Sequence, residues 1–262
     1  MMGKCQIGLA MYTVHQSAAN DILGTFNRLA AMGYEAIEFY GALNQFDYDS
    51  TKEALNASGL SLAGWHVEWR DLQDDRFHDT VKALRAFSCG TAIVPCLGGK
   101  WRVAHGPDLE NFDTWKRHID WLNRTAAALG SEGLQAGYHN HEHEFQLVYE
   151  GRRVFDHLFE NLDERIIMEF DSGNCIEGGG DPVQILEKYK DRTIYLHLKP
   201  YSYEKGFEVV LGGPGDANDW TRILAVPGVS FEMLLVESEA TALPEMENAR
   251  LCLDGLRRVL NS

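Results

Sequence analysis

The chain has few basic residues for its length. Its 24 lysines and arginines stand against 39 aspartates and glutamates in 262 residues, which gives a formal net charge of -15. A field of that sign repels phosphate backbones and anionic membrane surfaces, so a nucleic-acid binder would need a local basic patch. The sequence contains no such patch. We therefore expect no nucleic-acid partner.

Long apolar runs and paired cysteines are also missing. No stretch approaches the roughly 20 apolar residues that a bilayer-spanning helix needs, and the opening MMGKCQIGLAMYTVH lacks the features of a secretory signal. The cysteines are odd in number and have no CxxC spacing, so we expect free thiols in a reducing compartment. These absences predict a cytoplasmic protein with no membrane partner. The five cysteines are Cys5, Cys89, Cys96, Cys175 and Cys252.

Hydrophobic periodicity predicts short buried strands that alternate with amphipathic helices along the whole chain. The dipeptide Asp181-Pro182, for example, is a typical helix start, with Asp as N-cap and Pro in the first turn. Strands are expected at 6–12, 35–40, 61–67, 91–96, 134–141, 165–171, 193–199 and 231–237. Helices are expected at 21–32, 50–58, 74–87, 108–129, 152–159, 183–189, 220–224 and 246–260.

Strict alternation of this kind requires a parallel sheet covered by helices. Eight units in about 250 residues match a single (β/α)8 barrel of the α/β class, and residues 1–262 are then expected to form one domain. The alternative is a doubly wound open sheet, which usually carries a glycine-rich fingerprint after its first strand. Residues 11–15, Met-Tyr-Thr-Val-His, contain no glycine. The barrel is therefore favoured.

Unusual polar residues occur at the expected carboxyl ends of the strands, which meet at one mouth of a barrel. A single histidine or glutamate there is usually a solvated loop residue, but a buried cluster of carboxylates is costly without a cation or shared protons. The combination predicts one divalent metal ion, and mostly oxygen ligands favour Mn²⁺, Mg²⁺ or Co²⁺ over Zn²⁺. The polar strand-end residues include His15, Glu38, His66, Glu68, His139, Glu144, Glu169, Asp171, His197, Lys199, Glu237 and Glu239.

Four late motifs carry a resemblance to a known family. YHNHEHEF (138–145), EFDSGN (169–174), LHLKP (196–200) and VESE (236–239) resemble the xylose-isomerase-like TIM-barrel superfamily. This superfamily holds sugar and sugar-phosphate isomerases and epimerases, inosose dehydratases and endonuclease IV. The histidines needed for the trinuclear zinc site of endonuclease IV are not evident. The likeness extends to the opening IGLAMYTV and to GYEAIEFYG, and it departs from the family at the loop GGPGD (212–216) and at Pro200.

The resemblance implies a ligand set for the metal. Carried over from the epimerases, the ligands are Glu144, Asp171, His197 and Glu237, with Glu142 as an alternative for the first. It also implies four residues that face the substrate, namely His66, His139, Asn174 and Lys199.

The chemistry that these residues imply is proton transfer next to a carbonyl. A metal that chelates an α-hydroxyketone stabilises the enediolate formed on deprotonation, and Glu144 and Glu237 would act as paired acid and base. His141 would orient the substrate or shuttle protons, or one of the pair His139 and His141 would only support a metal ligand. This predicts a sugar or sugar-phosphate isomerase or epimerase.

Two other functions stay open. The same enediolate can expel a substituent, which would make the protein a lyase or dehydratase of an inosose or a 3-keto-sugar. A non-catalytic sugar or metal binder is the second alternative, and filled ligand positions argue against it. Trp65, Trp69 and Trp101 are expected near the mouth, where they would stack on a sugar or pack in the rim. Homo-oligomers are common in such barrels, and the oligomeric state stays open.

Overall fold

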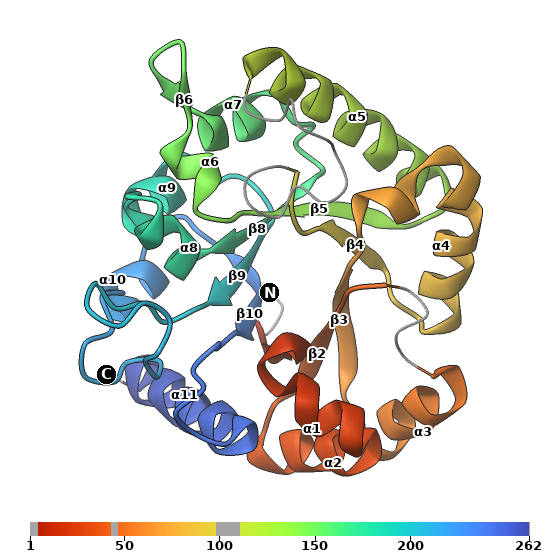
Figure 1. Cartoon of the computed structure of the whole chain (residues 1–262), viewed down its shortest axis with the longest axis vertical. Helices are drawn as coiled ribbons and strands as arrows, with labels where there is room; N and C mark the ends of the chain where they lie inside the picture. The colour runs from red at the N-terminus through yellow and green to blue at the C-terminus, as the bar shows by residue number, and fades with distance from the viewer. Residues whose placement is uncertain (1–4, 43–46, 98–110, 262) are drawn as a thin grey trace.

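Eight parallel strands form a closed barrel in the computed structural model, which describes residues 5–42, 47–97 and 111–261 (Figure 1). Around the barrel the order is β1-β10-β9-β8-β5-β4-β3-β2. The (β/α)8 fold predicted from the sequence is therefore confirmed. The strands are β1 (Gln6–Ala10), β2 (Ala36–Tyr40), β3 (Ser61–His66), β4 (Thr91–Val94), β5 (Gln135–His139), β8 (Ile167–Asp171), β9 (Ile194–Leu198) and β10 (Phe231–Val236).

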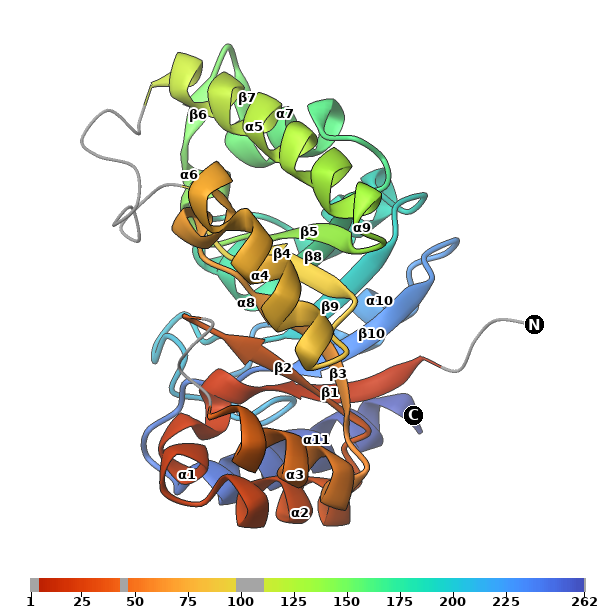
Figure 2. The same cartoon turned by 90° about the vertical axis from the view of Figure 1, so that its right-hand side faces the viewer.

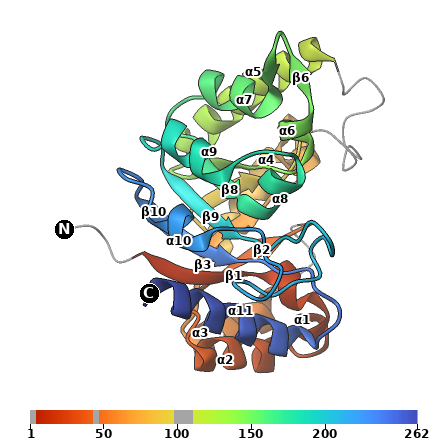
Figure 3. The ribbon, with the colours of Figure 1, turned by 90° about the vertical axis from the view of Figure 1, so that its left-hand side faces the viewer.

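Helices surround the barrel, as the two side views show (Figures 2 and 3). Eight correspond to the expected helices: α2 (Ile22–Met32), α3 (Tyr48–Ser58), α4 (Asp74–Ala86), α5 (Phe112–Ser131), α7 (Val154–Asn161), α9 (Pro182–Lys188), α10 (Trp220–Leu224) and α11 (Glu245–Leu260). Residues 108–110, where one of them was expected to begin, lie outside the described ranges. None of the helices in those ranges has the length and apolar content needed to cross a bilayer.

Several short elements were not expected from the sequence. They include a two-stranded antiparallel sheet of β6 (Val148–Tyr149) and β7 (Arg152–Arg153). The others are α1 (His15–Asn20), α6 (His143–Gln146), α8 (Ser172–Glu177) and the 3-10 helices η1 (Met11–Val14) and η2 (Trp69–Leu72). Most of these follow the carboxyl end of a barrel strand, so they shape the mouth of the barrel.

Local capping explains where the outer helices begin and end. The Asp21 side chain accepts a hydrogen bond from the backbone N–H of Gly24 and caps α2, which stops at Gly33 with a left-handed φ of 103°. Asp181 caps α9 in the same way, with Pro182 in its first turn. Both arrangements satisfy backbone groups that the helix itself leaves unpaired.

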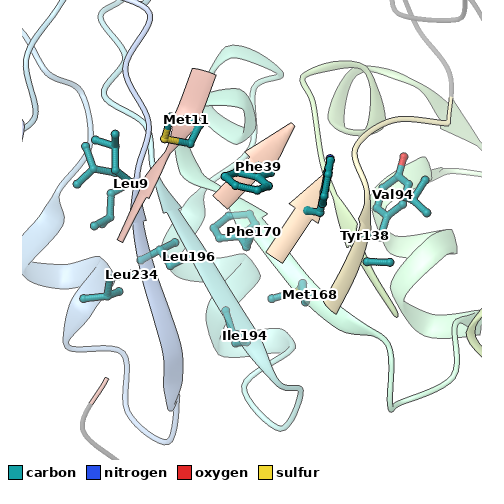
Figure 4. Packing of buried hydrophobic residues seen from close by; sticks show 14 of the residues in the cluster. Leu9, Met11, Phe39, Val94, Tyr138, Met168, Phe170, Ile194, Leu196 and Leu234 are labelled. Carbon is teal, nitrogen blue, oxygen red and sulfur yellow. The ribbon is translucent and has the colours of Figure 1, made fainter. Parts of the chain in front are cut away.

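The strand side chains alternate between the helical layer and the barrel interior. Phe170 packs against Phe155 of α7, with ring centroids 6.1 Å apart, so Glu169 and Asp171 on either side of it turn inward. Outward strand residues of this kind build the main core (Figure 4), among them Leu9, Phe39, Val94, Tyr138, Met168, Phe170, Ile194, Leu196 and Leu234, and Met11 of η1 joins them. A smaller apolar cluster comprises Ala36, Ala63, Ile167, Tyr195, Met233 and Leu235. Most of its members come early in their strands, which places this cluster away from the mouth.

Two helical glycines offer a matched test of this packing. A Cβ at Gly255 of α11 would collide with the backbone oxygen of Leu211, whereas a Cβ at Gly130 of α5 would meet nothing within 4 Å. We expect Gly255→Ala to lower the free energy of unfolding by about 1–3 kcal/mol. Gly130→Ala should raise it by up to about 1 kcal/mol, because alanine favours the helix. Urea denaturation measures both, and a fully stable Gly255→Ala protein would contradict the packing described.

Candidate active site

A cavity of about 500 Å³ opens at the carboxyl ends of the strands, the face on which TIM barrels carry their active sites. Its lining comes from segments that are far apart in the chain, from Tyr12 after β1 to Glu239 after β10. The four residues expected to face substrate all line it: His66, His139, Asn174 and Lys199. His141, expected to take part in catalysis, lines it too.

Four buried residues beside the cavity could hold a metal ion. His139 ends β5, Asp171 ends β8, His197 lies in β9 and Glu237 follows β10, and each offers one ligand atom within 4.8 Å of the others. The Nδ1 atom of His197 lies 2.7 Å from Oε2 of Glu237. The Nε2 atom of His139 lies 3.8 Å from Oδ2 of Asp171. We call these four residues the ligand cluster.

Two acids outside the ligand cluster, Glu169 and Glu38, contact the histidine rings. Oε2 of Glu169 lies 2.6 Å from Nε2 of His66 and 3.0 Å from Nδ1 of His139. Oε2 of Glu38 lies 2.9 Å from Nε2 of His197 and 3.1 Å from Nε2 of His66. In His139, Nδ1 therefore faces Glu169 and Nε2 faces Asp171 of the ligand cluster. In His197, Nε2 faces Glu38 and Nδ1 faces Glu237 of the ligand cluster. Metal-binding histidines commonly have such a carboxylate partner, which fixes the tautomer and the ring orientation.

The charge of neighbouring histidines explains how the carboxylates of Glu38 and Glu169 can be buried. Burial lowers the pKa of His66, but Glu38 and Glu169 raise it to about 10, so its imidazolium compensates their charge. Burial likewise raises the pKa of Glu38, but His66 and His197 bring it well below its usual range. Burial lowers the pKa of His139 well below its usual value, which keeps that ring neutral and able to ligate a metal.

Asp171 shows that the residues fit a cation. Its Oδ1 accepts a hydrogen bond from the backbone N–H of Asn174 at 2.8 Å and so caps α8. Its Oδ2 is buried and has no hydrogen-bond partner among the described residues. Burial raises the pKa of this carboxyl to about 7, although the charge of Lys199 opposes the shift. The Nζ of Lys199 is 4.0 Å from Oδ2 of Asp171. A divalent cation closer to this oxygen would compensate its charge, since buried charges are usually paired or coordinate metals.

Lys199 links the ligand cluster to the rim of the cavity. Its Nζ lies 3.0 Å from Oε1 of Glu237 and 2.6 Å from Oε1 of Glu239. Burial lowers the pKa of this lysine, but the neighbouring Glu237, Asp171 and Glu239 raise it well above its usual value. Burial raises the pKa of Glu237, but Lys199 and His197 bring it well below its usual range. The pair is therefore charged at neutral pH.

The observed cluster differs in one member from the set expected from the family resemblance. Asp171, His197 and Glu237 come together, but Glu144 lies in α6, fully buried and outside the cavity lining. Its carboxylate accepts hydrogen bonds from the Tyr138 hydroxyl at 2.5 Å and from the backbone N–H of His141 at 2.8 Å.

Glu144 lies outside the ligand cluster because β5 ends at His139. Within β5, side chains alternate, so Tyr138 points to the helical layer and His139 into the barrel. The chain then leaves the strand and Glu144 is carried to the side of Tyr138. The alternative first ligand, Glu142, lines the cavity but does not belong to the cluster.

Sequence reasoning gave Glu38 and Glu169 no individual role. The sequence could have indicated them, because each is a glutamate between apolar residues of a buried strand, in AIEFY and IMEFD. A charge buried in this way requires a partner. Of the expected tryptophans, Trp65 packs in the core against Phe39 and Phe87, and Trp69 lines the cavity. Trp101 lies outside the described residues.

Comparisons with known proteins identify the family. Residues 26–226 match the family model described as xylose isomerase-like TIM barrel, and the chain belongs to this family of enzymes. It is similar to an inosose dehydratase of Geobacillus kaustophilus, with 28% identity over 193 residues that cover 68% of this chain and 61% of the relative. An inosose dehydratase of Clostridium perfringens is 31% identical over 198 residues, with coverage of 70% and 65%. The chain thus matches less than two thirds of the length of these relatives.

Solved structures share the fold. A crystal structure of a sugar phosphate isomerase/epimerase from Parabacteroides distasonis superposes with a TM-score of 0.78. The two chains are 20% identical, and the match covers 97% of this chain and 98% of the other.

The two candidates for the first metal ligand can be separated by metal binding. We expect His139→Ala to weaken Mn²⁺ binding by at least about tenfold, since it removes a ligand together with its carboxylate support. The isosteric change Glu144→Gln should leave the affinity nearly unchanged, because that carboxylate lies outside the ligand cluster. Isothermal titration calorimetry on both variants measures this. The reverse pattern would restore Glu144 as the ligand.

Proposed function

We propose that the protein is a divalent-metal-dependent dehydratase that acts on a polyhydroxylated ketone, such as an inosose or a keto-sugar. Glu237 carries the proposal, because it is the one carboxylate of the ligand cluster that also lines the cavity. Elimination needs one base at the α-carbon and one proton donor at the leaving hydroxyl. The dehydratase activity of the relatives supports this choice over other reactions of the fold.

The ligand cluster would hold the metal through His139, Asp171, His197 and Glu237. Mn²⁺, Co²⁺ or Mg²⁺ bound there would act as a Lewis acid that polarises the substrate carbonyl. Two imidazoles and two carboxylates suit Mn²⁺ and Co²⁺ better than Mg²⁺, which prefers oxygen ligands. Glu169 and Glu38 keep both rings in the orientation that this role requires.

The Glu237–Lys199 pair can perform the proton transfers. Glu237 is ionised and removes the α-proton, a carbon–carbon double bond forms, and the β-carbon–oxygen bond breaks. Lys199 donates the proton that the departing hydroxide needs to leave as water. Protonation of Glu237 removes one of the negative charges that raise the pKa of Lys199, so the lysine then becomes a better donor. Direct transfer across the 3.0 Å contact restores both groups.

An isomerase or epimerase is the second candidate, and His141 is the observation that favours it. Epimerisation returns a proton to the opposite face of the enediolate, which requires a second group. Glu144 lies outside the cavity lining, so the paired-glutamate form of this mechanism lacks one member. His141 lines the cavity, and burial together with the charge of Lys199 lowers its pKa well below the usual value. A neutral imidazole there could exchange the proton.

Product analysis in D₂O with Mn²⁺ separates the two reactions. We expect an inosose to lose water and give a conjugated product that absorbs in the ultraviolet. Recovered ketose that contains deuterium but has lost no water would identify the isomerase instead. Ketose phosphates in the same panel test whether phosphorylated sugars are substrates.

Two substitutions test the residues. We expect Glu237→Gln to lower kcat for dehydration by about 10²–10⁴-fold, the usual contribution of a general base. Glu239→Gln is the matched control, because Glu239 also contacts Lys199 but lies outside the ligand cluster. This variant should retain most of the dehydration activity. His141→Gln should lower the rate of any isomerisation and leave the rate of dehydration unchanged. Full dehydration activity in Glu237→Gln would refute the proposed base.

A further inference from the structure

The mouth of the barrel divides into two unlike halves. The ligand cluster occupies four consecutive strands in the barrel order, β10, β9, β8 and β5. Aromatic residues follow the three consecutive strands on another part of the ring: Tyr12 after β1, Tyr40 at the end of β2 and Trp69 after β3. All three line the same cavity as the ligand cluster. A substrate held at the cluster can therefore extend toward an aromatic wall.

The cavity is larger than one sugar ring requires. A six-carbon ring with its hydroxyls displaces about six waters of about 30 Å³ each, or roughly 180 Å³. The cavity measures about 500 Å³, so a single ring at the cluster leaves more than half of it empty. The remaining space is sufficient for a second ring of similar size.

The aromatic wall is pre-positioned and accessible. Tyr12 is 43% exposed, yet its ring packs edge-on against Tyr40 with centroids 5.4 Å apart and stacks on His15 at 5.3 Å. Trp69 contacts Trp121, with ring centroids at 6.0 Å. Aromatic rings that are packed on one side and open on the other present a rigid face at low entropic cost.

Charge in the cavity disfavours an anionic extension. Among the lining residues that the structure describes, the lysine and arginine side chains are those of Arg70 and Lys199. Arg70 lies 2.7 Å from Glu68, and Lys199 is held by Glu237 and Glu239. Both cations are therefore already paired, and the carboxylates outnumber them. An uncharged ring fits this wall better than a phosphate or a carboxylate does.

We propose that the aromatic wall is a subsite for a second, uncharged ring that is joined to the keto ring by a glycosidic bond. This inference rests on the proposed function, because it keeps the same base, proton donor and elimination. It names a substrate class, a keto-glycoside, in which the leaving group is an alcohol in place of water. The bond that breaks is then the glycosidic carbon–oxygen bond at the β-position. The α-proton passes to Glu237, the double bond forms between the α- and β-carbons, and the second ring leaves as a neutral alcohol with a proton from Lys199.

Binding to the Glu237→Gln protein, which keeps three of the four proposed ligands and is assayed at saturating Mn²⁺, tests the subsite without turnover. The probes are 3-keto-glucosides with a methyl, a 4-nitrophenyl or a glucosyl group at the glycosidic oxygen. We expect the 4-nitrophenyl or glucosyl compound to bind at least about tenfold more tightly than the methyl compound, and the two arms identify which ring is preferred. Trp69→Leu and Tyr40→Leu should remove the difference. Tyr203→Leu, whose side chain is 79% exposed and outside the cavity lining, is the matched control and should keep it.

The outcomes separate the subsite from the proposed function. Equal affinity for all three probes overturns the subsite, even where the wild-type protein dehydrates an inosose. Preferential binding that persists in both wall variants overturns it as well. If the wild-type protein neither exchanges an α-proton nor eliminates water or an alcohol from any substrate, the proposed function is overturned. Tighter binding of a two-ring probe would still support the subsite.

Discussion

The carboxylate of Glu169 lies at the centre of the buried network on which the site depends. It contacts His66 and His139 directly and lies 3.4 Å from His197, so residues from β3, β5 and β9 meet at one acid. Replacing a charged member of such a network leaves its partners buried and unpaired, which typically costs about 3–5 kcal/mol. Glu38 completes the network from β2. The rings that face the ligand cluster are thus oriented from inside the barrel.

This arrangement follows from the alternation of side chains along the strands. Phe170 and Tyr138 join the core beneath the helices, and their neighbours Glu169 and His139 must then face the interior. The apolar packing that stabilises the barrel and the polar network that shapes the site are therefore two faces of the same strands. Short elements at the mouth, such as η1, η2 and α8, bring further side chains to the cavity without altering the barrel.

The sequence predicts the barrel well, because each strand and helix carries a local pattern of apolar residues and caps. The family resemblance also brings in Asp171, His197 and Glu237, which stand at strand ends in recognisable motifs and lie together in the structure. Their role as metal ligands stays a prediction. The sequence does not decide among the polar residues of HNHEHE, since the choice depends on the residue at which β5 stops. The contact between Glu38 and His197 joins positions 159 residues apart and leaves no local signal. The aromatic wall is only partly foreseen: Trp69 reaches it, whereas Trp65 packs in the core.

Asp171 connects the ligand cluster to the backbone of the fold. One carboxylate oxygen starts α8 and the other faces the cluster, so the same side chain caps a helix and belongs to the proposed metal site. Any change in charge at the second oxygen is transmitted through the carboxylate to the first turn of α8. The amide protons of that turn, Asn174 in particular, would therefore exchange with solvent at rates that depend on metal occupancy. Hydrogen exchange at a helix start would thus report on metal occupancy in the absence of any substrate.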